Sequence, residues 1–206
     1  MNPDDVMFEY HKIKIDKNKQ DVLRRKAWDK YFLEICNKVS ENSKCLSRQV
    51  GAILVRDKSI ISSGYNGPPR GLYHCWERYA LQKDEKLMKK INERIERDEL
   101  TKDDFNKYVE SEVCPRRILG FKSGFGLELC WAGHGERNSI INAARHGIAV
   151  KGCKMYCNCG VPCGDCMIEI INSGVEEVIV TKIEFYDEKS EILLKESGIN
   201  IREYIL

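Results

Sequence analysis

The sequence lacks any run that approaches the roughly 18 consecutive apolar residues of a membrane-spanning helix. Residues 1–10 are polar and acidic, without the apolar core of a secretory signal peptide. Internal repeats and low-complexity segments are also absent, which excludes a repeat array. We therefore expect a cytoplasmic protein that has no membrane partner.

The chain also lacks an excess of charge of either sign. Its 34 basic and 32 acidic residues leave a formal net charge of +2. A dedicated nucleic-acid-binding protein usually carries a clear basic excess, so this balance disfavours nucleic acid as a partner, although a local basic patch stays compatible with it. With 206 residues, 42% of them hydrophobic, the chain is long enough to bury a core without disulfides.

Cysteine is the residue type that needs an explanation, because ten are present. Cytosolic thiols stay reduced, so clustered cysteines indicate metal binding or catalysis before disulfides. They form a dense group, consisting of Cys153, Cys157, Cys159, Cys163 and Cys166, and a scattered group, consisting of Cys36, Cys45, Cys75, Cys114 and Cys130.

Hydrophobic periodicity predicts that helices and strands alternate. The first helix covers residues 21–40, with an aromatic stripe that we expect to pack on the core, and a β-hairpin follows with strands at 49–56 and 59–65. Beyond residue 133, the predicted helices cover 136–146, 163–172 and 188–197, and the predicted strands cover 152–157, 177–182 and 200–205. This order predicts an α/β fold with parallel neighbours in its second half.

Residues 71–133 interrupt that alternation. Residues 81–112 are rich in Lys, Glu, Asp and Arg and predict one or two solvated helices, whereas residues 114–126 predict an irregular basic loop. We expect a single domain over residues 1–206 with a largely helical insertion at about 71–133.

The segment Pro-Cys-Gly-Asp-Cys at 162–166 indicates a metal site. Cys163 and Cys166 are three positions apart in the first turn of a predicted helix, so their thiols lie on one face and close enough to bind one ion. Pro162 suits the start of a helix, whose positive end favours thiolates. On its own, this spacing also fits a redox pair or half of a zinc ribbon.

His134 supplies a third ligand, and one imidazole with two thiolates suits zinc. Three protein ligands leave one tetrahedral position open, which is typical of a catalytic zinc rather than a structural one. Glu136, two residues further on, is not needed as a ligand and is placed to move protons between water and a substrate. Each of these residues alone is unspecific, but together they resemble the zinc-deaminase signature His-x-Glu followed by Pro-Cys-x-x-Cys.

The chain resembles the cytidine and deoxycytidylate deaminase family, and within it the deoxycytidylate (dCMP) deaminase branch. The segments that carry the resemblance are CLSRQVGA at 45–52, GYNGPPRG at 64–71, residues 115–130, ERN at 136–138, AARHG at 143–147 and residues 175–180. The resemblance implies a three-layer α/β/α sandwich around a five-stranded mixed sheet of the cytidine-deaminase-like type.

The activity that this resemblance implies is zinc-dependent hydrolysis of dCMP to dUMP. In that reaction zinc-bound hydroxide attacks C4 of cytosine, while Glu136 protonates N3 and then the leaving ammonia. The resemblance places Asn66 at the sugar hydroxyl and Asn138 near the substrate. Arg48 and Arg70 are candidates for phosphate contact, because a guanidinium matches phosphate geometry.

The resemblance further implies a homo-oligomer, commonly a hexamer, and dCTP and dTTP as effectors, with Mg²⁺ as a companion of an allosteric nucleotide. Some members of the branch carry a second, structural zinc. Its candidate ligands here are Cys45, Cys75, Cys114 and Cys130, with His74 as an alternative, and this zinc would hold the insertion on the core. Buried, reduced thiols are the other interpretation.

Three features depart from the family pattern. Gly135 replaces the usual alanine, and Arg137 follows the catalytic glutamate, where it would reach a phosphate, a neighbouring subunit or solvent. Residues 156–162 are one residue longer than expected and add Cys159 and Gly160 beside the base pocket. A modified cytosine nucleotide is therefore an alternative substrate.

Two other functions compete with this interpretation. A deaminase of polynucleotide bases, acting on tRNA adenosine or single-strand cytosine, would share the zinc site but needs a basic groove with aromatic platforms. A catalytically inactive zinc-binding regulatory protein would have no use for Glu136. The near-neutral charge and the loop at 64–71 favour a free nucleotide.

Overall fold

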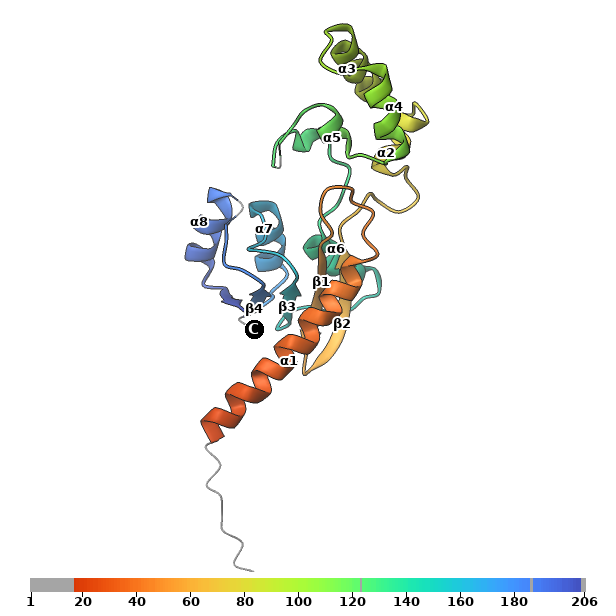
Figure 1. Cartoon of the computed structure of the whole chain (residues 1–206). Coiled ribbons are helices and arrows are strands. Elements are labelled where there is room, and N and C mark those ends of the chain that lie inside the picture. The colour runs from red at the N-terminus through yellow and green to blue at the C-terminus, as the bar shows by residue number, and fades with distance from the viewer. Residues whose placement is uncertain (1–16, 123, 186, 205–206) are drawn as a thin grey trace, which may run out of the picture.

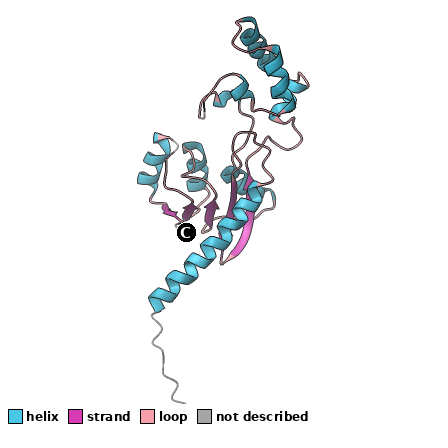
Figure 2. Ribbon diagram, viewed as in Figure 1, coloured by secondary structure: helices cyan, strands magenta, loops and turns pink. Residues whose placement is uncertain are grey.

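A five-stranded mixed sheet organises this computed structural model, which describes residues 17–122, 124–185 and 187–204 (Figures 1 and 2). The strands are β1 (Gly51–Arg56), β2 (Ser59–Tyr65), β3 (Lys154–Cys157), β4 (Glu177–Val180) and β5 (Asn200–Glu203), and their order in the sheet is β2-β1-β3-β4-β5. β1 runs antiparallel to both β2 and β3, whereas β3, β4 and β5 are parallel. The mixed sheet and its parallel second half are therefore confirmed.

Helices cover both faces of the sheet because its central strands are apolar on both sides. On one face lies α1 (Lys17–Ser40), which buries Phe32, Leu33 and Cys36 against Ile53 and Tyr156. The opposite face carries α6 (Gly135–Arg145), α7 (Gly164–Asn172) and α8 (Glu188–Ser197). The three-layer sandwich is thus confirmed (Figure 1). No helix in the described ranges has the length and apolarity that a membrane crossing requires.

The aromatic stripe of α1 is only partly buried, which corrects the expectation that it packs on the core. Phe32 is buried, but Trp28 and Tyr31 are 37% and 49% exposed. The helix begins at Lys17 and its N-terminal half extends past the sheet (Figure 1), so Val22 and Leu23 have no strand to cover them. Periodicity identified the helix but did not indicate how far the sheet extends beneath it.

The segment from residue 71 to 133 forms a separate group of helices away from the sheet (Figure 2). It contains α2 (Cys75–Ala80), α3 (Glu85–Glu96), α4 (Lys102–Glu110), α5 (Pro115–Ile118) and the 3-10 turn η1 (Leu127–Leu129). The helices α3 and α4 fall within the predicted range 81–112. Two expectations for this segment are wrong. Residues 114–126 are not wholly irregular, because they contain α5. The helices are also not simply solvent-exposed, because they bury apolar side chains against one another. They share their own apolar cluster, formed by Tyr79, Leu87, Ile91, Leu100 and Ile118.

A charged network ties α1 to the far strands of the sheet. Arg202 on β5 donates to both carboxylate oxygens of Asp29 on α1, at 2.6 and 3.1 Å. The Tyr156 hydroxyl donates to Asp29 Oδ1 at 2.9 Å, and Arg202 Nε donates to Glu177 at 3.0 Å. Because Asp29 is only 2% exposed, its charge depends on these donors.

We expect Asp29→Ala to lower the free energy of unfolding by about 3 kcal/mol, since it leaves the Arg202 guanidinium without its buried partner. Chemical denaturation followed by circular dichroism measures this change. Lys30→Ala on the same helix is the control, because the Lys30–Glu34 pair is exposed and spans 3.9 Å. Equal stabilities of the two variants would contradict a role for the network.

Candidate metal centre

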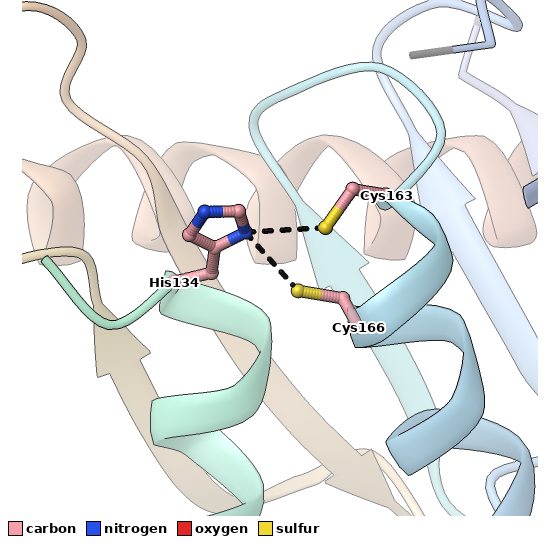
Figure 3. Close-up of side chains that lie close together, drawn as sticks. All are labelled: His134, Cys163 and Cys166. Atoms are coloured by element: carbon pink, nitrogen blue, oxygen red, sulfur yellow. Dashed lines mark hydrogen bonds between the residues drawn. The ribbon is translucent and has the colours of Figure 1, made fainter. Parts of the chain in front are cut away.

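Three side chains from two helix starts converge in a single cluster (Figure 3). His134 is the N-cap of α6, Cys163 is the N-cap of α7, and Cys166 lies in the first turn of α7. The His134 Nδ1 atom lies 3.3 Å from Cys163 Sγ and 3.2 Å from Cys166 Sγ. The structure therefore brings together the three residues that the sequence pattern predicts as zinc ligands.

Close packing of α6 on β1 and β2 places His134 at this point. A Cβ atom added at Gly135 would lie 2.9 Å from the Val50 carbonyl oxygen, and one added at Gly64 would lie 2.2 Å from the Ser139 backbone nitrogen. Glycine at these two positions lets the helix backbone approach the strands directly. The glycine that replaces the usual alanine after His134 thus has a packing reason in this chain.

Asp187, the N-cap of α8, also orients the first turn of α7. Its carboxylate accepts hydrogen bonds from the backbone nitrogens of Gly164, at 3.0 Å, and Ser190, at 2.7 Å. Gly164 lies between the two cysteines of the cluster, so this bond fixes the turn that presents both thiols. Asp187 carries no signal in the sequence, because an aspartate at a helix start is common and its contact with α7 is long-range.

The electrostatics of the cluster favour a cation. A hydrogen bond with Cys166, followed by one with His134, lowers the pKa of Cys163 to about 4. A hydrogen bond with Cys163 and burial raise the pKa of Cys166, and a hydrogen bond with Cys163 raises the pKa of His134. Two adjacent thiolates repel each other, and a positive ion between them would offset that cost. Two thiolates and one imidazole are a donor set that fits zinc.

Glu136 is buried beside the cluster, at 5% exposure, in the first turn of α6. Burial raises the pKa of its carboxyl group, whereas its own backbone N–H, His134 and the Cys159 thiol act in the opposite direction. Glu136 does not belong to the group of ligand atoms that lie within 4.8 Å of one another. Its position therefore suits proton transfer rather than metal binding.

The two predicted substrate-binding asparagines both hold the loop that follows β2. Asn66 accepts from Val50 N at 2.8 Å through Oδ1 and donates to the Arg48 carbonyl at 2.7 Å through Nδ2. Asn138 on α6 donates to the Tyr65 carbonyl at 2.8 Å. Both amides therefore shape the loop itself, and their contacts with a substrate stay predictions.

The loop is also joined to the segment that carries His134. Gly67 and Gly133 exchange two backbone hydrogen bonds, at 3.1 and 2.9 Å, in an isolated antiparallel bridge. Because Gly133 immediately precedes His134, the loop at 64–71 and the metal cluster are held in one arrangement.

A groove with a volume of about 520 Å³ lies between this loop and α6. Three arginines line it, namely Arg70, Arg137 and Arg145. The other lining residues are Tyr65, Gly67, Pro68, Pro69, Gly133, Asn138, Ile141 and Asn142. Arg70 also donates to Asn142 Oδ1 at 3.0 Å. Arg48, the other phosphate candidate, is exposed and does not line this groove.

Arg137 has a partner that the sequence did not indicate. Its guanidinium forms an ion pair with Glu169 on α7 at 2.7 Å, and the side chain also lines the groove and stays 41% exposed to solvent. This pair links the helix that carries Glu136 to the helix that carries Cys166. Contacts with a phosphate or a neighbouring subunit stay predictions.

The four candidate ligands of a second zinc are neighbours without forming a tight cluster. Burial raises the pKa of Cys75 to about 11, with smaller contributions from the charges of Cys130, Cys114 and Cys45. Among the described residues, however, only His134, Cys163 and Cys166 have three ligand atoms within 4.8 Å of one another. The nearby His74 Nδ1 is buried and has no hydrogen-bond partner in the part of the chain that the structure describes.

We expect Cys166→Ala to remove one equivalent of zinc relative to the unchanged protein, because two remaining ligands bind this ion weakly. Metal content of the dialysed protein, determined by plasma mass spectrometry, is the measurement. Cys36→Ala truncates a buried thiol on the opposite face of the sheet and should retain the zinc. Unchanged zinc content in Cys166→Ala would place the metal elsewhere.

Comparison with known proteins identifies relatives over most of the chain. Residues 26–182 match the family model described as the cytidine and deoxycytidylate deaminase zinc-binding region. Deoxycytidylate deaminase of Saccharomyces cerevisiae is 29% identical over 194 residues, which are 94% of this chain and 50% of that protein. Deoxycytidylate deaminase of Enterobacteria phage T4 is 31% identical over 176 residues, covering 82% of this chain and 86% of the phage protein.

The chain spans about half the length of the two yeast relatives, from S. cerevisiae and Schizosaccharomyces pombe. A solved structure with a similar fold is the dCMP deaminase of cyanophage S-TIM5 in apo form, with a TM-score of 0.53 and 19% identity. The match covers 85% of this chain and 95% of that one.

Proposed function

The chain belongs to the cytidine and deoxycytidylate deaminase family, and from that premise we propose that it hydrolyses dCMP to dUMP and ammonia. The observation that carries the proposal is the cluster of His134, Cys163 and Cys166 with the buried carboxylate of Glu136 beside it. The names of the yeast and phage relatives support the choice of dCMP as substrate.

His134, Cys163 and Cys166 would hold a zinc ion through one nitrogen and two sulfur atoms. When bound, zinc supplies Lewis-acid activation of water at neutral pH. Asp187 keeps the cysteine-bearing turn in place through the Gly164 backbone, and the Arg137–Glu169 pair keeps the two ligand-bearing helices together. A Cys₂His set leaves one tetrahedral position for a reactant, as in a catalytic site.

Glu136 would transfer the protons of the reaction. Its raised pKa suits a carboxylate that accepts a proton from the attacking water and passes it to N3 of cytosine. A second transfer to the amino group at C4 lets the C4–N bond break and ammonia leave. Because Glu136 is buried, bulk water does not compete for these protons.

The loop at 64–71 would position the nucleotide. We assign Asn66 to the sugar and Asn138 to the neighbourhood of the substrate, with Arg48 and Arg70 as the phosphate candidates. The Gly67–Gly133 bridge supports this assignment, since it places the loop next to the metal cluster.

Regulation and assembly are further parts of the proposal. The groove lined by Arg70, Arg137 and Arg145 has the charge that the phosphates of dCTP or dTTP with Mg²⁺ require. Exposed apolar side chains of α1, among them Val22, Leu23 and Tyr31, suit contact with another subunit of a homo-oligomer, for which a hexamer is the family-based expectation.

A structural second zinc would use Cys45, Cys75, Cys114 and Cys130, or His74 in place of one cysteine. The charges of Cys130, Cys114 and Cys45 act on the Cys75 thiol, and His74 Nδ1 is buried without a hydrogen-bond partner among the described residues, which supports it. Binding would require these side chains to approach one another more closely than they do here.

Substrate choice is tested by ammonia release and ultraviolet absorbance with dCMP, CMP, dCTP, deoxycytidine and 5-modified dCMP. We expect preferential turnover of dCMP by the zinc-loaded protein. Turnover of a 5-modified nucleotide alone would indicate that the enlarged loop at 157–162 shapes the pocket for a modified base. Failure with every cytosine nucleotide, with zinc bound, would contradict the proposal and favour a polynucleotide substrate or an inactive zinc protein.

We expect Glu136→Gln to retain zinc while its kcat falls by about 10²- to 10⁴-fold, the range for loss of a general acid–base group. Steady-state kinetics with dCMP and parallel metal analysis make this measurement. Glu176→Gln alters an exposed carboxylate and should keep the original kcat. A Glu136→Gln enzyme that is as fast as the unchanged protein would remove Glu136 from the mechanism.

A further inference from the structure

The thiol of Cys159 lies against the carboxylate of Glu136. Its S–H group donates to Oε1 across a sulfur–oxygen distance of 3.7 Å. Both residues are buried, with exposures of 6% and 5%. Among the described residues, Cys159 is the only one whose side chain donates a hydrogen bond to this carboxylate.

Neighbouring elements hold Cys159 firmly in place. Its carbonyl oxygen accepts from the Thr181 backbone nitrogen at 3.0 Å and from the Thr181 hydroxyl at 3.1 Å. The preceding residue, Asn158, accepts from Gly51 N at 2.8 Å and donates to Ser40 Oγ at 3.0 Å. The segment is thus anchored to β1, to the end of α1 and to the residue that follows β4, which fixes the backbone that carries the thiol.

A second thiol lies behind the first. A hydrogen bond with Cys159 is the largest cause that raises the pKa of the Cys157 thiol, and burial is the next. Cys157 is fully buried, so its thiol stays protonated. The Cys157 thiol thus lies next to the Cys159 thiol, which in turn contacts the Glu136 carboxylate.

We propose that Cys159 is a positioning residue that holds the Glu136 carboxylate for proton transfer by donating its thiol hydrogen to Oε1. The inference rests on the proposed function, in which Glu136 moves protons between water and the cytosine ring. A glutamate side chain has three rotatable bonds, and general acid–base catalysis depends on its carboxylate staying within hydrogen-bond reach of the reacting atoms. The additional residues of the loop at 157–162 would therefore contribute to catalysis as well as to the shape of the base pocket.

The decisive comparison is between Cys159→Ala and Cys159→Ser in the zinc-loaded, full-length protein. We expect kcat for dCMP to fall about tenfold or more in Cys159→Ala with KM within about twofold, which is the pattern of a lost transition-state interaction. In Cys159→Ser a hydroxyl donates in place of the thiol, so kcat should stay within about threefold of the original value.

Cys153→Ala is the matched control, because Cys153 is a fully buried thiol of the same apolar core that makes no hydrogen bond to Glu136. The Cys153→Ala variant should keep the original kcat, although it loses about as many van der Waals contacts of a buried sulfur atom as Cys159→Ala does. Thermal midpoints and zinc content of all variants show whether each one is folded and loaded. Normal turnover by Cys159→Ala, or an equal loss in the Ala and Ser variants, would overturn the inference.

Infrared spectroscopy of the S–H stretch tests the contact without any turnover. The band that disappears in Cys159→Ala should move to higher frequency in Glu136→Ala, because the acceptor is lost. A band that does not respond to Glu136→Ala overturns the inference even if dCMP is deaminated. A band that responds in a protein that deaminates no cytosine nucleotide overturns the proposed function, and with it the catalytic role of Cys159, while the contact itself stands.

Discussion

The structure depends on bringing two thiols and an imidazole to one point although their segments are 29 and 32 residues apart. Such a cluster is electrostatically unfavourable once both thiols ionise, so it requires a cation as well as rigid support. The support comes from helix starts. Both α6 and α7 begin at the cluster, Gly135 and Gly64 allow α6 to lie directly on the strands, and Asp187 fixes the first turn of α7. The three candidate ligands are thus held by the same packing that holds the helices on the sheet.

Burial of Glu136 is the second consequence of this arrangement. The same tight packing that places His134 also puts the carboxylate below the surface, where ionisation costs free energy. That cost is useful in a group that must accept and release protons, provided that the carboxylate is held in one orientation. The protein groups that act on it are its own backbone, the His134 imidazole and the thiols of Cys163 and Cys159, so the starts of α6 and α7 and the loop at 157–162 meet at this carboxylate.

The two ends of the helical segment from 71 to 133 meet beside His134. Gly67, shortly before the segment, pairs with Gly133, its last residue, so the chain leaves and returns at the same place. Its own cluster around Tyr79 and Ile91 lets the helices pack without help from the sheet.

The sequence by itself determined the order of the helices and strands and indicated the three candidate ligand residues, because periodicity and the spacing Cys-x-x-Cys are local properties. The five-stranded mixed sheet followed from the family resemblance. The sequence also identified Glu136 and the enlarged loop at 157–162. Only the tertiary structure decided that Arg137 pairs with Glu169, that Asp187 supports α7, and that Cys159 contacts Glu136. The tertiary structure alone also decided that Tyr31 is exposed and that α2–α5 share a separate apolar core. Each of these depends on which residues distant in the chain become neighbours, and a pattern read along the chain carries no information about those distances.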